Sequence, residues 1–161
     1  MKRKYSLIVF PSLAVLVLDQ LTKWIIVRTI AIHKSIPVID GFLHLVHVRN
    51  RGMAFGLMNR VGSDIPSYLL VFFTLVAVFL LLFWALGLKP GEQRMLPGLS
   101  LIIGGALGNL IDRLRLHEVI DFIDVSVGSF HWPAFNVADS AITLGTIWVA
   151  LNLLFRRPSG P

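Results

Sequence analysis

The sequence predicts an all-α membrane protein with four transmembrane helices, a small extracytoplasmic β-sheet and loop elements. Its 161 residues are 55% hydrophobic and only 15% charged, with a mean hydropathy of +0.75. A water-soluble core of this size cannot bury so much apolar surface. The apolar residues also gather in four long runs. Each run can cross a hydrocarbon layer of about 30 Å, which takes about 20 helical residues.

The four runs are interpreted as one integral membrane domain covering residues 1–161. The predicted spans are residues 7–27, 67–88, 95–111 and 137–155, with extracytoplasmic loops at 28–66 and 112–136. The first run follows three basic residues, but it is long and no small-residue cleavage site follows, so we interpret it as a retained helix. Gly104, Gly105 and Gly108 give the third span a small-residue face on which another helix can pack closely.

The basic residues predict the orientation. Lys and Arg are divided evenly between short and long segments, but they are denser at the two chain ends and in the short connection at 88–95. Positive charge beside span ends favours the cytoplasmic side. Both termini and this connection are therefore predicted to be cytoplasmic, and the two longer loops to lie outside.

Polar residues are predicted to gather at the outer interface. They are Asp19, Lys23, Asp112, Arg113, Asn136 and Asp139. A charge near mid-membrane costs about 2.5 to 3.5 kcal/mol, so this group requires a structural or functional reason. Internal pairing is one reason, because Asp19 precedes Lys23 by four residues and Asp112 is placed to neutralise Arg113. Such pairing leaves Asp139 without an obvious cation.

Two segments of the longer loops predict short strands. Residues 42–48 alternate in the manner of a half-exposed strand, with Phe42, His44, Val46 and Val48 on one face. The segment NRGMAFG at 50–56 follows as a turn whose backbone can approach a ligand. The segment VIDFID at 119–124 places Asp121 and Asp124 on nearly opposite sides, so only one should face the site. The strand pattern leaves open which one.

Five motifs together, in this order, resemble the lipoprotein signal peptidase (signal peptidase II) family, and the resemblance spans nearly the whole chain. They are DQLTK at 19–23, NRGMAFG at 50–56, GGALGNLIDR at 104–113, VIDF at 119–122 and FNVADS at 135–140. The resemblance implies an aspartic endopeptidase of the bacterial inner membrane, with its active site toward the outer, periplasmic face. Its substrates would be diacylglyceryl-modified prolipoproteins, cleaved before the lipidated cysteine, and globomycin would inhibit it.

The same resemblance implies the site residues. Asp121 and Asp139 would form the catalytic pair. Residues that bind substrate or hold the pair would be Asn50, Gly52, Asn109, Arg113, Asn136 and Ala138, with structural support from Asp19, Lys23 and Asp112. Two carboxylates in one site share a proton, so one serves as base and the other as acid, and no metal or cofactor is required. Which aspartate is the base stays open.

Other functions have less support in the sequence than an aspartic peptidase. A small transporter or proton channel would also use intramembrane charges, but it needs a continuous polar path, and the inner halves of the spans are nearly free of charge. A Ser140–Lys23 dyad is conceivable but lacks motif support. The five histidines show no HExxH-type zinc spacing. The net charge of +6 forms no aromatic-interleaved basic face, so nucleic acid is not expected as a partner. Partners are membrane lipid and substrate, and a monomer is expected because one chain supplies every site element.

Overall fold

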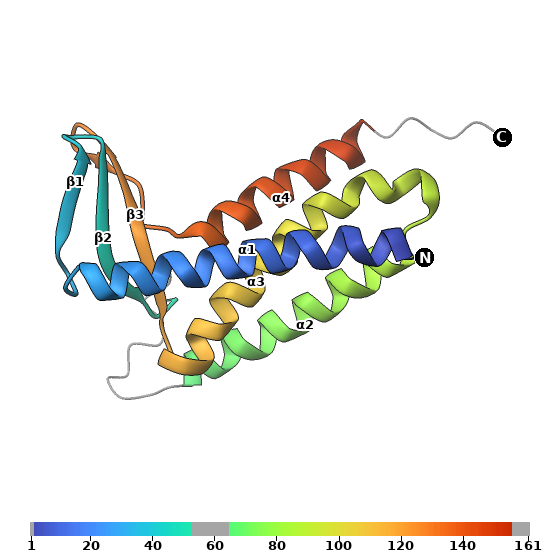
Figure 1. The fold of residues 1–161 in the computed structure, drawn as a ribbon, viewed down its shortest axis with the longest axis horizontal. Helices are drawn as coiled ribbons and strands as arrows, with labels where there is room; N and C mark the ends of the chain where they lie inside the picture. Colours follow the sequence, from blue (N-terminus) through green and yellow to red (C-terminus); the bar gives the residue numbers. More distant parts are fainter. Residues whose placement is uncertain (1, 53–64, 156–161) are drawn as a thin grey trace.

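The computed structural model describes residues 2–52 and 65–155, which form four long helices and one small sheet. The helices are α1 (Lys2–Thr29), α2 (Ile65–Gly87), α3 (Leu96–Leu116) and α4 (Val137–Leu154), and a 3₁₀ helix, η1 (Pro90–Met95), joins α2 to α3. All four long helices are long and apolar enough to cross a membrane. The sheet lies at one end of the bundle, and the start of α1, the α2–α3 connection and the end of α4 lie at the other (Figure 1). The predicted fold class is confirmed.

Helix α3 differs most from its predicted span. It continues past residue 111 to Leu116 and ends where His117 adopts a left-handed conformation, with φ of 59°, while donating its backbone N–H to the carbonyl of Arg113. Arg113 and Arg115 lie in the last turn, where positive charge complements the helix dipole. Asp112 and Arg113 therefore lie in the final part of the helix rather than in the loop after it, which hydropathy alone does not reveal.

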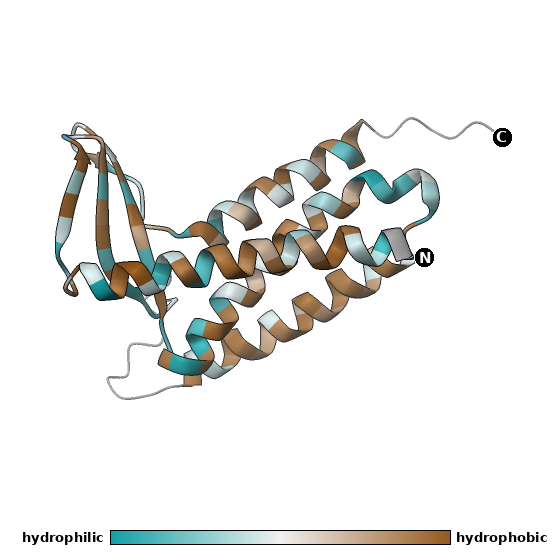
Figure 2. Cartoon of the chain, in the orientation of Figure 1, coloured by the Kyte–Doolittle hydropathy of each residue, from teal (hydrophilic) through white to brown (hydrophobic). Residues whose placement is uncertain are grey.

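Helix α3 is the centre of the bundle. In its most apolar 18-residue window 67% of the residues are buried, against 11% in α2, so α2 presents most of its surface outward. The helices are rich in apolar residues (Figure 2), and many large apolar side chains on them are exposed, as a lipid environment allows. This arrangement leaves polar groups of α3 shielded by its neighbours.

Glycines on α3 allow the close packing. A Cβ atom at Gly104 would lie 2.6 Å from the carbonyl oxygen of Ser12 on α1, and one at Gly105 would collide with the carbonyl oxygen of Ala138 on α4. The predicted small-residue face is thus confirmed. It brings the backbones of α1 and α4 against adjacent sides of α3, and both helices meet it at Gly108.

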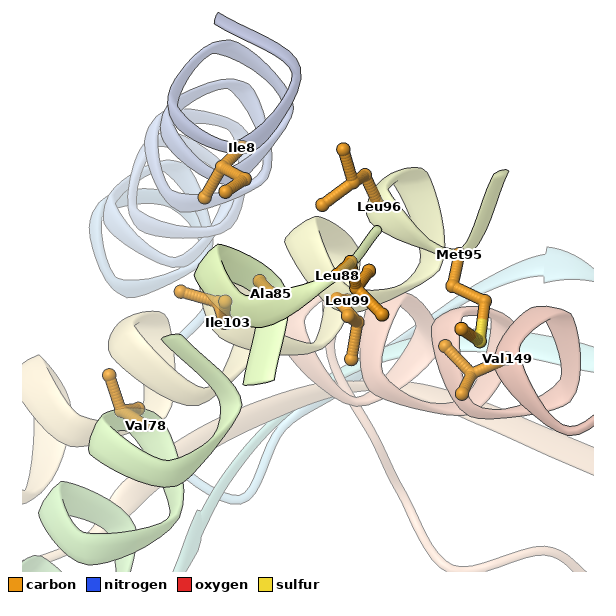
Figure 3. Packing of buried hydrophobic residues seen from close by; sticks show 9 residues of the cluster. All are labelled: Ile8, Val78, Ala85, Leu88, Met95, Leu96, Leu99, Ile103 and Val149. Atoms are coloured by element: carbon orange, nitrogen blue, oxygen red, sulfur yellow. The ribbon is translucent and has the colours of Figure 1, made fainter. Parts of the chain in front are cut away.

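The bundle end opposite the sheet holds an apolar cluster drawn from all four helices (Figure 3). Its buried members are Ile8, Val78, Ala85, Leu88, Met95, Leu96, Leu99, Ile103 and Val149. With this end filled by hydrocarbon side chains, the charged groups described below lie toward the sheet.

The sheet has the strand order β1-β2-β3-β4, with antiparallel neighbours. Its strands are β1 (Ser35–Ile39), β2 (Leu43–Asn50), β3 (Val119–Val127) and β4 (Phe130–His131). The predicted strands at 42–48 and 119–124 correspond to β2 and β3, whereas β1 and β4 were not anticipated. The predicted alternation along 42–48 is wrong, because the register shifts between Leu45 and Val48 and buries the adjacent residues Val46 and His47. Asn50 is the last residue of β2, and most of the turn predicted at 50–56 lies outside the described residues.

Candidate active site

Strand β3 turns Asp121 toward the helix bundle. Its carboxyl group is 2% exposed, and it accepts hydrogen bonds from Asn50 Nδ2 at 3.0 Å and Asn136 Nδ2 at 2.7 Å. Asp124 lies three residues further along the strand and therefore on the other face. It lies 3.7 Å from Nδ1 of His131 on β4. The structure thus brings Asp121, and not Asp124, to the polar end of the bundle.

The start of α4 positions Asp139. Asn136 is the N-cap residue, and its Oδ1 accepts a hydrogen bond from the backbone N–H of Asp139 at 2.9 Å. In return, Asp139 Oδ2 accepts from the backbone N–H of Asn136 at 3.3 Å. This reciprocal capping box begins the helix and holds the carboxylate at its N-terminus, where negative charge is favoured.

Two buried amides join the aspartates. Asn136 caps Asp139 and donates to Asp121, so it contacts both. Asn109 of α3 donates its Nδ2 to Asp139 Oδ1 at 2.8 Å and accepts from Asn136 Nδ2 at 3.2 Å. Burial raises the pKa of the Asp121 carboxyl to about 6; the nearby Asp139 carboxylate also raises it, while the amide hydrogen bonds oppose the rise. The pair can therefore hold a proton at moderate pH.

A buried lysine supports this network from α1. Lys23 Nζ lies 2.9 Å from Asp19 Oδ2, 2.8 Å from Asp112 Oδ2 and 2.9 Å from Asn109 Oδ1. These contacts use all three N–H donors of the ammonium. The predicted Asp19–Lys23 pair is confirmed. Asp112 binds Lys23 through Oδ2 and also interacts electrostatically with Arg113, the residue it was predicted to neutralise.

The two supporting carboxylates also bind backbone. Asp19 Oδ1 accepts from the N–H of Ala138 at 2.9 Å, and Asp112 Oδ2 accepts from the N–H of Ile120 at 3.2 Å. A Cβ at Gly108 would lie 2.5 Å from Asp19 Oδ2. One charged cluster thus holds the first turn of α4 and the start of β3 against α3, next to both aspartates.

Gln20 was missed by the sequence reasoning. Its Nε2 donates to Asp112 Oδ1 at 3.0 Å and to the carbonyl of Gly108 at 3.1 Å. An amide beside Asp19 in the middle of an apolar span is the signal that could have identified it, because such a group needs internal partners. It holds Asp112 in place for Lys23.

The remaining predicted residues lie around the pair. Asn50 Oδ1 accepts the backbone N–H of Gly52 at 2.8 Å, which orients its amide toward Asp121; Gly52 has φ of 75°, a conformation that favours glycine. Arg113 is partly buried and interacts electrostatically with Asp139, Asp112 and Asp121. The rest of the NRGMAFG motif, residues 53–56, lies outside the described residues.

Other chemistries find less support in the geometry. Ser140 Oγ donates to the carbonyl of Asn136 at 2.9 Å, while Lys23 is held by carboxylates and an amide, so a Ser140–Lys23 dyad is not formed. In the part of the chain that the structure describes, no group of three His, Cys, Asp or Glu residues is placed to hold a metal ion.

Four apolar helices and one strand bring together two carboxyl groups joined by buried amides, an arrangement typical of a membrane hydrolase of the aspartic type. Comparison with known proteins specifies the family. A model of the family described as signal peptidase (SPase) II matches residues 12–155. The chain belongs to the signal peptidase II family, and it is a peptidase.

Individual relatives agree with this family. A lipoprotein signal peptidase of Syntrophus aciditrophicus is 39% identical over 157 residues, covering 98% of each chain. Another, from Geobacter sulfurreducens, is 44% identical over 154 residues, covering 96% of this chain and 95% of the relative. A solved structure described as a bacterial membrane enzyme superimposes with a TM-score of 0.81 at 33% identity, over 92% of this chain and 93% of that one. The chain is thus a multi-pass bacterial membrane protein, and a transporter or proton channel has no support.

Proposed function

We propose that this peptidase removes signal peptides from diacylglyceryl-modified prolipoproteins, cleaving before the lipidated cysteine, with Asp121 and Asp139 as the catalytic pair. Signal-peptide removal from prolipoproteins is the reaction of its family. The observation that supports the pair most strongly is Asn136, which donates to Asp121 and caps Asp139 with the same side chain. Gln20 also bridges two carboxyl groups, Asp19 and Asp112, but these two already bind the ammonium of Lys23.

The reaction needs one ionised and one protonated carboxyl group. The ionised member takes a proton from water as the water oxygen attacks the scissile carbonyl carbon. The protonated member hydrogen-bonds the carbonyl oxygen and stabilises the charge that develops there. When the tetrahedral intermediate collapses, the first proton passes to the leaving amine. The raised pKa of Asp121, about 6, favours a single proton on the pair when substrate arrives.

The surrounding residues hold this pair and the substrate. Asn109 and Asn136 orient the carboxyl groups, and Asn50, held by Gly52, binds Asp121. Arg113, which interacts electrostatically with Asp139, is proposed to bind substrate. Supporting roles fall to Ala138, Asp19, Lys23 and Asp112, which fasten α4 and β3 to the bundle.

The site is proposed to lie at the outer face of the inner membrane. The pair stands where the bundle meets the sheet, so acyl chains can stay in lipid beside the apolar helices while the peptide bond meets water. Since one chain holds the whole network, it is proposed to act as a monomer. Globomycin-type cyclic peptides are proposed to inhibit it by occupying the same site.

The direct test is cleavage of a lipidated prolipoprotein by the purified protein in detergent. We expect a single shift on a gel, lost on addition of globomycin, without any partner protein. The same substrate with its cysteine left unmodified is the control and should be cleaved far less. Cleavage of both forms at equal rates would contradict the proposed substrate class.

The orientation makes a separate prediction. Reporters fused after Gly91 and after Arg157 should read cytoplasmic, because basic residues are densest in these segments. A reporter fused after Asp40, between β1 and β2, should read external. An external signal from the reporter after Arg157 would place the site on the other face of the membrane.

A further inference from the structure

We propose that Lys23 and Asn109 act as positioning residues that fix the negative charge of the pair on Asp139 and leave the shared proton on Asp121. Asp139 is then the base that takes the water proton, and Asp121 is the acid that binds the scissile carbonyl oxygen. This inference rests on the proposed function, because it assigns roles within the proposed pair. It makes a distinction that the sequence left open.

The first step is the orientation of the Asn109 amide. Its Oδ1 receives an N–H from Lys23 Nζ at 2.9 Å and another from Asn136 Nδ2 at 3.2 Å. A flipped amide would turn its own N–H groups toward these two donors. The amide nitrogen must therefore face Asp139, to which it donates at 2.8 Å. Lys23 cannot turn away, since its other two donors hold Asp19 and Asp112.

The second step concerns the surroundings of Asp139. The ammonium of Lys23 polarises the Asn109 amide and makes its Nδ2 a stronger donor to the carboxylate. Asp139 also lies at the N-terminus of α4, accepts the backbone N–H of Asn136 and remains only partly buried. Among the three carboxylates around it, Arg113 interacts most strongly with Asp139. Each of these features favours the ionised form.

The surroundings of Asp121 favour the opposite form. Its side chain is 2% exposed and lies on a strand, without a helix terminus to hold a charge. Its two donors, Asn50 and Asn136, are neutral amides. The Asn136 nitrogen also faces the carbonyl of Ile120 and Oδ1 of Asn109. Its two N–H hydrogens therefore serve three acceptors, of which Asp121 is one. The pKa of Asp121, raised to about 6 by burial, agrees with a retained proton.

The charge balance around the pair also requires a retained proton. From α1, Asp19 and Lys23 face the site, and from α3, Asp112 and Arg113 do so. At the edge of the site, Glu118 is occupied by Arg49 and Arg51, while β2 presents only the neutral Asn50 to Asp121. The two cations are already matched by Asp19 and Asp112. Ionisation of both catalytic aspartates would leave two uncompensated charges, and one proton removes half of this excess.

The resulting reaction is balanced. Asp139 takes a proton from water while the water oxygen bonds to the carbonyl carbon, and Asp121 passes its proton to the carbonyl oxygen. On collapse, Asp139 gives its proton to the leaving nitrogen as the C–N bond breaks, and the hydroxyl proton returns to Asp121. One water enters, a carboxylic acid and an amine leave, and the pair regains its resting state.

The position of the proton can be tested without activity. The pKa of Asp121 lies at about 6 in the folded protein, above its ordinary value of 3.8. The free energy of unfolding should therefore fall as pH rises from about 4 to about 6, and this group should cause no further change above that range. The thermal midpoint of the purified protein, measured from pH 4 to 8, should show this loss in the wild type. The loss should vanish in Asp121→Asn and persist in Asp139→Asn and in the control Asp124→Asn. Its loss in Asp139→Asn with retention in Asp121→Asn would overturn the proposal.

The role of Asn109 is tested by the pH dependence of kcat/KM. The acid limb is the fall in kcat/KM at low pH, where the base becomes protonated. Asn109→Leu should move this limb to higher pH by about half a pH unit or more and lower kcat about tenfold or more, because the charge on Asp139 loses its hydrogen-bond donor. Asn109→Ser, a milder change, should move the limb in the same direction. The matched control is Gln20→Leu, which disturbs the same Asp112 from α1 but does not contact the pair. It should lower thermal stability and leave the limb in place.

The outcomes separate this inference from the proposed function. If Asp121→Asn and Asp139→Asn still cleave substrate at the wild-type rate, the catalytic pair itself is wrong. If both are inactive but neither Asn109 variant moves the acid limb relative to Gln20→Leu, the pair stands and the positioning roles of Lys23 and Asn109 are refuted. If the pH dependence of the thermal midpoint is lost only in Asp121→Asn, and the Asn109 variants shift the acid limb, then both the catalytic pair and the positioning roles are supported.

Discussion

Asp121→Asn and Asp139→Asn variants are each expected to lose cleavage by about 10²- to 10⁴-fold or more, the range for removal of a general acid or base. Asparagine matches the shape of the carboxyl group and keeps an oxygen that accepts hydrogen bonds, so both variants should remain folded in the membrane. An amide cannot take the proton of the attacking water or return it. The measurement is the rate of conversion of a lipidated prolipoprotein by purified protein at equal concentration.

Asp124→Asn is the matched control for this experiment. It changes the same residue type three positions along β3, on the face that contacts His131, and should retain most of the activity. The double variant of Asp121 and Asp139 should be no slower than the weaker single variant, since members of one catalytic unit fail together. Both single variants should still bind globomycin. Turnover by Asp139→Asn, or loss confined to Asp124→Asn, would refute the catalytic pair.

Lys23→Met should destabilise the protein by about 3 to 5 kcal/mol, because it leaves Asp19 and Asp112 buried without a cation. Lys23 is 2% exposed, and both carboxyl groups are buried with it. The variant should also shift Asn109 and slow cleavage. The measurement is the thermal midpoint and the yield of folded protein in detergent, followed by the cleavage rate.

The matched control is Lys34→Met, which removes the same charge from an exposed lysine beside β1 and should change stability by no more than about 0.5 kcal/mol. Adding Asp19→Asn to Lys23→Met should recover part of the loss, because it removes one unpaired charge and keeps an acceptor for the N–H of Ala138. Equal behaviour of Lys23→Met and Lys34→Met would mean that Lys23 is solvated and does not support the site.

Several features of the site followed from local rules. The spacing of Asp19 and Lys23 predicted an ion pair, and the structure contains it. The period of two along a strand predicted that Asp121 and Asp124 point apart, and they do. The glycines at 104 and 105 predicted close helix contact, and the backbones of α1 and α4 lie there. These predictions succeeded because each depends on the geometry of a single element.

Predictions that depended on neighbouring elements were less accurate. The third span looked complete at residue 111, yet α3 continues to Leu116, and Asp112 in this extension finds its partners on α1 and β3. The strand β1 escaped notice because its residues, SIPVI, are all exposed and contain a proline. Its pairing with β2 supplies the order that its own sequence lacks.

The sequence by itself determined the class of the protein: its four apolar runs require a membrane, and five ordered motifs indicate the family and two candidate aspartates. Only the tertiary structure decided how the charges are shared. Lys23 binds Asp112 from another helix, Asn109 stands between that lysine and Asp139, and Asn136 reaches both aspartates. The physical reason is that apolar runs and helix spacings are encoded over a few neighbouring residues. A buried charge instead takes its partner from whichever element the packing brings within about 3 Å of it.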